Sequence, residues 1–163
     1  MIALDTSALI AIVSNEPEAL SFATLVSQND CLVGAPTQFE AILVANRDAG
    51  GGAYRDLLEI LAWKNVAIVD FSAAHAAIAY RAFRNFGRGR GHRAALNYGD
   101  CMAYAVASLA STPLLFKGDH FAHTDIPAAW RPRAPPIAGT RHSQESSAVD
   151  RPHPTVARID AAR

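Results

Sequence analysis

The chain has 163 residues, enough for about one domain, and half of them are hydrophobic. This composition excludes a mostly disordered protein. Charged residues make up only 18% of the chain and the formal net charge is +0, so no global field favours binding to nucleic acid. The charge is uneven, because residues 1–130 hold 12 acidic and 9 basic side chains, net −3, whereas residues 131–163 hold 3 acidic and 6 basic, net +3.

Short apolar runs alternate with helical patterns along residues 1–116. Strands are predicted at residues 1–4, 31–35, 66–71 and 113–116. Helices are predicted at residues 8–13, 18–27, 36–47, 54–63, 73–86 and 98–111, the first capped by Thr6 and Ser7 and the fifth by Ser72. Apolar strands alternating with helices indicate an α/β domain, a three-layer arrangement with a central, mainly parallel sheet and helices on both faces.

Helical periodicity also predicts which side chains face the core. On the helix that holds Glu40, the inward positions are expected to be Phe39, Ile42, Leu43 and Val44, and on the fifth helix Ala76, Ala79, Tyr80 and Phe83. His75, His92, His120 and His123 lack the i,i+4 spacing of helical metal ligands and are assigned to surface or turn positions. Cys31 and Cys101 stand alone, which predicts buried free thiols.

The two ends of the chain differ in character. Residues 1–130 are predicted to form the domain. Residues 131–163 hold five prolines and many Ser and Arg, which predicts a disordered tail because too little apolar surface is available to offset its ordering entropy. The N-terminus is apolar but lacks a basic start and carries Asp5, so neither a signal peptide nor a transmembrane helix is expected. A cytoplasmic protein follows.

Two acidic residues follow strands of the predicted sheet. Asp5 ends the first strand, and Asp119 comes shortly after the last. Ligands of open parallel sheets bind beyond the carboxyl ends of the strands, so both carboxylates are expected at one crevice if their strands are neighbours. Glu40 and Asp100 lie on helices among apolar residues, where an unpaired acid is costly.

A divalent metal ion is the simplest partner for several converging carboxylates with few cations nearby in the chain. Oxygen-only ligation selects hard ions such as Mg²⁺ or Mn²⁺. Such ions activate water and stabilise the leaving oxygen of a phosphodiester, so the acids indicate a nuclease more than a protease. Each acid also has a structural explanation, as a helix cap, a solvated helix residue or a turn residue.

Four segments together resemble the motifs of PIN-domain proteins, and most closely those of VapC toxins of bacterial toxin–antitoxin modules. They are DTSAL at residues 5–9, TQFEA around Glu40, NYGDCMAYAVA at residues 97–107 and LLFKGDHF at residues 114–121. The resemblance covers about residues 1–130. Many relatives carry a second acid where this chain has His120 and a Thr or Ser where it has Lys117.

The resemblance implies an Mg²⁺- or Mn²⁺-dependent endoribonuclease that cleaves RNA by activated water. It implies that Asp5, Glu40, Asp100 and Asp119 are catalytic, that Asp5, Asp100 and Asp119 hold metal, and that Thr6 or Ser7 orients Asp5 or a metal-bound water. It further implies inhibition by a cognate VapB-type antitoxin, and a homodimer, for which Leu20 and Phe22 are candidate exposed positions. An inserted Arg of such an antitoxin would pair with the clustered carboxylates.

Basic residues are expected around an acidic site that binds RNA. One local basic cluster lies at residues 81–93, and Arg88, Arg90 and Arg93 in its glycine-rich part are candidate phosphate contacts. Lys117, close to the predicted site, is a further candidate. The competing interpretation of this cluster is a solvated loop.

Two other functions remain in competition. A receiver-type phosphoacceptor domain would use Asp70 as acceptor and Lys117 as its lysine, but it leaves Glu40 and Asp100 unexplained. A PIN-like module that binds RNA or protein without cutting is the other, although the presence of all four acids argues against it.

Overall fold

The computed structural model describes residues 1–47 and 50–132, and the predicted disordered tail from residue 133 onward lies outside them. The elements, in chain order, are β1 (Ile2–Leu4), α1 (Thr6–Val13), α2 (Ala19–Gln28), β2 (Cys31–Gly34), α3 (Ala35–Ala45), α4 (Gly52–Leu61), β3 (Val66–Val69), α5 (Ala73–Phe86), α6 (Tyr98–Leu109), β4 (Leu114–Leu115) and the short 3₁₀ helix η1 (Phe121–His123). Every predicted strand and helix is present, with ends shifted by a few residues.

The four strands form one parallel sheet in the order β3-β2-β1-β4. β1 lies inside the sheet, with Ala3 opposite Leu32 on one side and Leu114 on the other. All carboxyl ends of parallel strands lie at the same edge. Asp5, directly after β1, therefore lies at the middle of that edge, and the chain leaving β4 passes beside it.

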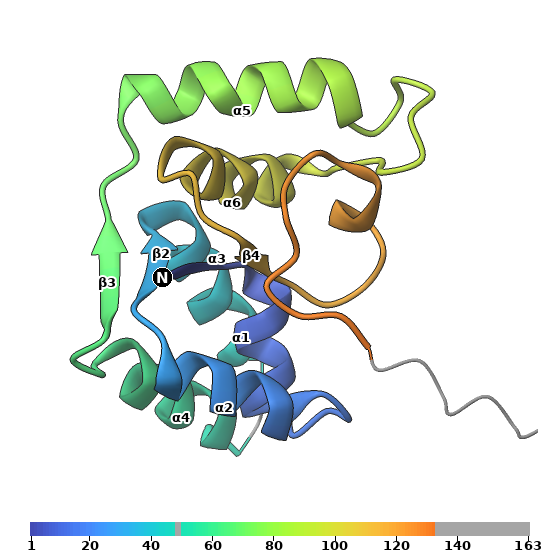
Figure 1. The fold of residues 1–163 in the computed structure, drawn as a ribbon. Coiled ribbons are helices and arrows are strands. Elements are labelled where there is room, and N and C mark those ends of the chain that lie inside the picture. Colours follow the sequence, from blue (N-terminus) through green and yellow to red (C-terminus); the bar gives the residue numbers. More distant parts are fainter. Residues whose placement is uncertain (48–49, 133–163) are drawn as a thin grey trace, which may run out of the picture. The chain divides into compact units, whose positions relative to one another are not determined.

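Side chains of the strands alternate between two apolar cores, one on each face. Ile2 and Leu4 pack with α1, α2, α3 and α4, whereas Ala3 and Leu114 pack with α5 and α6. Figure 1 shows α5 lying over α6, with α1, α2 and α4 on the opposite side of the sheet. The three-layer α/β architecture predicted from the sequence is confirmed.

The sequence predicts the capping residue correctly for α5 and incorrectly for α1. Ser72 is the N-cap of α5 as expected, and its backbone N–H donates to His75 Nδ1 at 3.1 Å. The cap of α1 is Asp5 rather than Thr6 or Ser7, because the Asp5 carboxylate accepts the backbone N–H of Ser7 at 2.9 Å. Thr6 and Ser7 belong to the helix itself.

Several predicted side-chain orientations are wrong. Four side chains predicted to face the core are exposed: Phe39, Leu43, Ala76 and Tyr80. Two side chains predicted to lie at the surface are buried: Phe22 and His75. The buried stripe of α2 is Ala19, Phe22 and Val26, spaced three and four residues apart, which leaves Leu20 outside it. Phe22 therefore belongs to the core and cannot contribute to an exposed dimer surface.

Two smaller expectations also have outcomes. Cys31 and Cys101 are buried free thiols, as predicted, and burial raises the pKa of each to about 11. None of the helices in the described part of the chain is both long and apolar enough to span a bilayer.

Candidate active site

Asp5 is held at the edge of the sheet from two directions. Its backbone N–H donates to the carbonyl of Leu115 in β4 at 2.9 Å, which fixes the main chain. Its Oδ2 atom accepts both the backbone N–H of Ser7 at 2.9 Å and the Ser7 hydroxyl at 2.5 Å. Ser7 Oγ also accepts the backbone N–H of Lys117 at 2.9 Å. One serine thus connects the acid to the chain that leaves β4.

Glu40 reaches the same region from α3. Thr6 donates its hydroxyl to Glu40 Oε2 at 2.7 Å, so the residue after Asp5 positions the second acid. The carboxylate also lies against the start of α6, where a Cβ added to Gly99 would stand 2.5 Å from Oε2 and 2.7 Å from Oε1. Those distances are shorter than a van der Waals contact, so a larger residue at position 99 would force the Glu40 carboxylate to move.

Asp100 is part of a capping box at the start of α6. Asn97 Oδ1 accepts the backbone N–H of Asp100 at 2.9 Å, and Asp100 Oδ2 accepts the backbone N–H of Asn97 at 2.8 Å. His120 Nδ1 lies 3.1 Å from the same Oδ2 atom. The acid therefore caps the helix and is held rigidly at the buried end of the site.

The three carboxylates influence one another electrostatically. Asp5 is only 4% exposed, and burial raises its pKa to about 6, with the negative charges of Asp100 and Glu40 raising it further against the opposing hydrogen bonds from Ser7. In the described residues no Lys or Arg forms an ion pair with any of the three. An unneutralised group of acids like this favours either protonation or a bound cation.

One oxygen of each carboxylate accepts all of its hydrogen bonds. These are Oδ2 of Asp5, Oε2 of Glu40 and Oδ2 of Asp100. Within residues 1–47 and 50–132, the second oxygen of each acid accepts no hydrogen bond. Three anchored carboxylates with one unshared oxygen each are chemically suited to a hard divalent ion.

The ligand set is not preassembled. In the part of the chain that the structure describes, no three Asp, Glu, His or Cys side chains are arranged as metal ligands. The donor chemistry of the three acids, which is carboxylate oxygen alone, is nevertheless the kind that Mg²⁺ or Mn²⁺ prefers.

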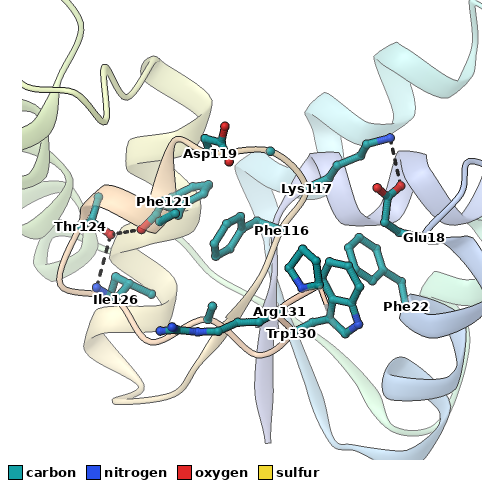
Figure 2. A pocket seen from close by; sticks show the side chains of 14 residues that line it. Glu18, Phe22, Phe116, Lys117, Asp119, Phe121, Thr124, Ile126, Trp130 and Arg131 are labelled. Carbon is teal, nitrogen blue, oxygen red and sulfur yellow. Dashed lines mark hydrogen bonds and ion pairs between the residues drawn. The ribbon is translucent and has the colours of Figure 1, made fainter. Parts of the chain in front are cut away.

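Asp119 lies apart from the other three acids. It is exposed, and its charge is not among those that raise the pKa of Asp5. It borders a cavity of about 600 Å³ lined by aromatic side chains, among them Phe22, Phe116 and Phe121, and Figure 2 shows it at the edge of that cavity. The structure thus brings together Asp5, Glu40 and Asp100 and leaves Asp119 at the periphery.

The candidate RNA contacts differ in how far their charges are already paired. Lys117 Nζ binds Glu16 at 2.6 Å and Glu18 at 3.1 Å, so its charge is largely compensated. Arg90 lies over the ring of Phe83, 5.0 Å from its centroid. Arg88 and Arg93 are exposed in the same loop. An isolated parallel β-bridge between Gly87 and Leu96 closes the base of this loop.

The geometry excludes the receiver-type arrangement. Asp70 follows β3, at the edge of the sheet, and Lys117 follows β4, at the opposite edge. Two strands separate them, whereas an acceptor and its lysine must share one site. Asp125, another acid of the segment after β4, accepts the hydroxyl of Tyr104 at 2.6 Å.

Comparison with known proteins agrees with this fold and site. The PIN domain family matches residues 2–127, so the chain belongs to that family. Ribonuclease VapC30 of Mycobacterium tuberculosis is 43% identical over 129 residues, covering 76% of this chain and 94% of the relative. Ribonuclease VapC of Mycolicibacterium smegmatis is 40% identical over 126 residues, covering 77% and 97%. Within the PIN domain family, the chain is therefore a member of the VapC ribonucleases.

Solved structures show the same fold. VapC20 of Mycobacterium tuberculosis, described as a toxin that cleaves the sarcin–ricin loop, superposes with a TM-score of 0.59 at 15% identity and covers 75% of this chain and 93% of its own. A toxin–antitoxin complex from Klebsiella pneumoniae gives 0.57 at 19% identity, covering 75% and 91%. Both agree with a parallel α/β sandwich for this chain.

Three residues of the site were missed by the sequence analysis. Gly99 makes room for the Glu40 carboxylate, Asn97 caps the helix of Asp100, and His120 contacts Asp100. The Asn at the helix start, three residues before an acid, was a readable capping signal. The contacts of Gly99 and His120 join residues distant in the chain and had no local signal.

Proposed function

We propose that this chain is a metal-dependent endoribonuclease and the toxin of a type II toxin–antitoxin pair. The observation that carries the proposal is a buried Asp5 whose pKa is raised to about 6 in the company of Asp100 and Glu40, with no Lys or Arg paired to the three acids among the described residues. Membership of the VapC family supports it, because the relatives are named as ribonucleases.

Each acid has a distinct role in this proposal. Asp5 and Asp100 would hold Mg²⁺ or Mn²⁺, with Asp119 as a further ligand from the loop after β4. When bound there, a divalent ion would supply Lewis acidity for the activation of water and for neutralising charge on the scissile phosphate. Glu40, held by Thr6, acts as a further ligand or orients water through its free oxygen, and Ser7 fixes the orientation of Asp5.

RNA would be held by the basic residues of the loop at 87–96. Arg88 and Arg93 are exposed and free to contact phosphates, and Arg90 is steadied by the ring of Phe83. Lys117 is assigned a different role, because its two ion pairs tie the loop after β4 to the start of α2.

The partners proposed are a VapB-type antitoxin and a second copy of this chain. One of the matched structures is a toxin–antitoxin complex. A cluster of acids without cations is a natural target for an inserted Arg, which binds carboxylates in a bidentate manner. Leu20, 81% exposed on α2, is a candidate contact of a homodimer.

The test is to express the chain in a bacterial host beside its Asp5→Asn variant and to map new 5′ ends in cellular RNA. The proposal predicts discrete cleavage sites with the wild type and none with the variant, both proteins being present in equal amounts. Identical RNA ends from both would contradict it. Tight RNA binding without products at millimolar Mg²⁺ or Mn²⁺ would instead favour a non-catalytic module.

A further inference from the structure

His120 approaches the site from the solvent side. It follows Asp119 in the loop after β4 and directly precedes η1. Its side chain is 49% exposed, whereas that of Asp100 is 11% exposed, and His120 Nδ1 lies 3.1 Å from Asp100 Oδ2. Among the described residues, it is the one imidazole with a hydrogen bond or ion pair to any of the three acids, and its partner is Asp100.

The separation of these two atoms is that of a hydrogen bond, and it also equals the separation of two neighbouring ligands of one ion. Two ligands at neighbouring positions of an octahedral ion, each about 2.0–2.1 Å from it, are separated by about 3 Å. His120 Nδ1 and Asp100 Oδ2 are already at that separation. Asp119, the neighbouring acid, has no hydrogen bond or ion pair with the other three within the described residues, so the loop places the imidazole nearer the acids than the carboxylate.

We propose that His120 is a ligand of the divalent ion, so that this site combines carboxylate oxygens with one imidazole nitrogen. The inference rests on the proposed metal-dependent function. Imidazole suits Fe²⁺, Ni²⁺ and Zn²⁺, whereas Mg²⁺ takes oxygen ligands almost exclusively. The site therefore prefers first-row transition ions over Mg²⁺ more strongly than an all-carboxylate site would.

A role in positioning alone is the alternative that must be separated. If His120 only donated a hydrogen bond to Asp100, its loss would weaken the binding of all divalent ions alike. If it is a ligand, its loss changes the ratio between ions. Loss of a ligand also removes a nitrogen nucleus from contact with the metal. Spectroscopy can detect this change without any measurement of catalysis.

The first experiment is pulsed electron paramagnetic resonance of Mn²⁺ bound to the full-length chain without RNA. Wild type and His120→Asp are compared, with His123→Ala in η1 as the matched control. Coupling to ¹⁴N is expected in the wild type and in His123→Ala, and its absence in His120→Asp with Mn²⁺ still bound. Bound Mn²⁺ without ¹⁴N coupling in the wild type, or coupling that persists in His120→Asp, would overturn the proposal while leaving the metal site in place.

The second experiment measures Ni²⁺ and Mg²⁺ affinities by calorimetry and by competition with Mn²⁺. His120→Asp is expected to lower the preference for Ni²⁺ over Mg²⁺ by at least about tenfold. An unchanged ratio would contradict ligation. Failure of the wild type to bind any of these ions, with Asp5→Asn behaving identically, would instead contradict the proposed metal-dependent function itself.

Discussion

Asp5 occupies the most constrained position of the site, buried at the end of the central strand and bonded twice to Ser7. Replacing it by Asn keeps the size and an oxygen acceptor for the Ser7 N–H but removes the charge. We expect Asp5→Asn to lower RNA cleavage at least about 100-fold. Loss of a residue that only supports a metal ligand costs up to about 100-fold, and loss of a ligand itself should cost at least as much. Single-turnover cleavage of a labelled RNA measures this, and circular dichroism verifies the fold.

The same residue makes a prediction for stability. Its pKa in the folded chain is about 6, above the ordinary value of 3.8, so the folded state binds an extra proton between these values. In metal-free buffer, stability should therefore fall as pH rises from about 4 to about 6, by up to about 3 kcal/mol. Asp5→Asn should lack this fall and be the more stable protein at pH 7.

Urea unfolding in EDTA at pH 4.5 and pH 7 measures the effect. Asp56→Asn, at an exposed acid of α4, is the matched control and should follow the wild type. A wild type whose pH dependence equals that of Asp5→Asn would show that Asp5 is not destabilised by its surroundings.

At the scale of elements, the contact between α3 and the start of α6 depends on Gly99. An alanine Cβ would overlap the Glu40 carboxylate and push it away from Thr6. We expect Gly99→Ala to reduce cleavage by about tenfold to 100-fold, because a misplacement of about 1 Å is enough for such losses. The far-ultraviolet spectrum should be unchanged.

A companion series at Thr6 identifies the cause. Thr6→Ser keeps the hydroxyl bonded to Glu40 and should retain activity, whereas Thr6→Val should lose it as Gly99→Ala does. Equal activity of Thr6→Val and the wild type would show that the position of Glu40 is unimportant.

The loop at 87–96 and the loop after β4 should respond differently to loss of charge. Arg88→Gln and Arg93→Gln should each weaken RNA binding and flatten its salt dependence, by about 0.7 in the logarithmic slope for each lost phosphate contact. Lys117→Gln should alter the slope little, since Lys117 already pairs with Glu16 and Glu18. Fluorescence anisotropy in the inactive Asp5→Asn background, at several salt concentrations, measures all three.

At the scale of the whole molecule, the element order and the sheet follow from the sequence because apolar strands alternate with amphipathic helices. Asp5 at the sheet edge follows from the same topology. The orientation of α5 follows only in part. Ala79 is buried as predicted, but Tyr80 is exposed, and the buried residues His75, Ala79 and Ala82 give a weak periodic signal because two of them are small. The contacts of Gly99 and His120 join distant segments and emerge only once the layers are packed.

Domain organisation leads to a prediction of its own. Residues 1–132 contain both cores and all three gathered acids. A chain ending at Pro132 should therefore unfold at the same temperature as the full chain and cleave the same RNA sites. Calorimetry and end mapping check this, and a marked loss of either property would assign the last 31 residues a part in the fold or in substrate choice.

Anomalous diffraction from crystals grown with Mn²⁺ tests the metal-dependent site most directly. A Mn²⁺ peak is expected within about 2.0–2.6 Å of carboxylate oxygens of both Asp5 and Asp100, and it should disappear in Asp5→Asn. Two results would contradict the account in a chain that cleaves RNA with Mn²⁺. One is the absence of a Mn²⁺ peak between these two acids, and the other is a Mn²⁺ peak only at a different place in the chain.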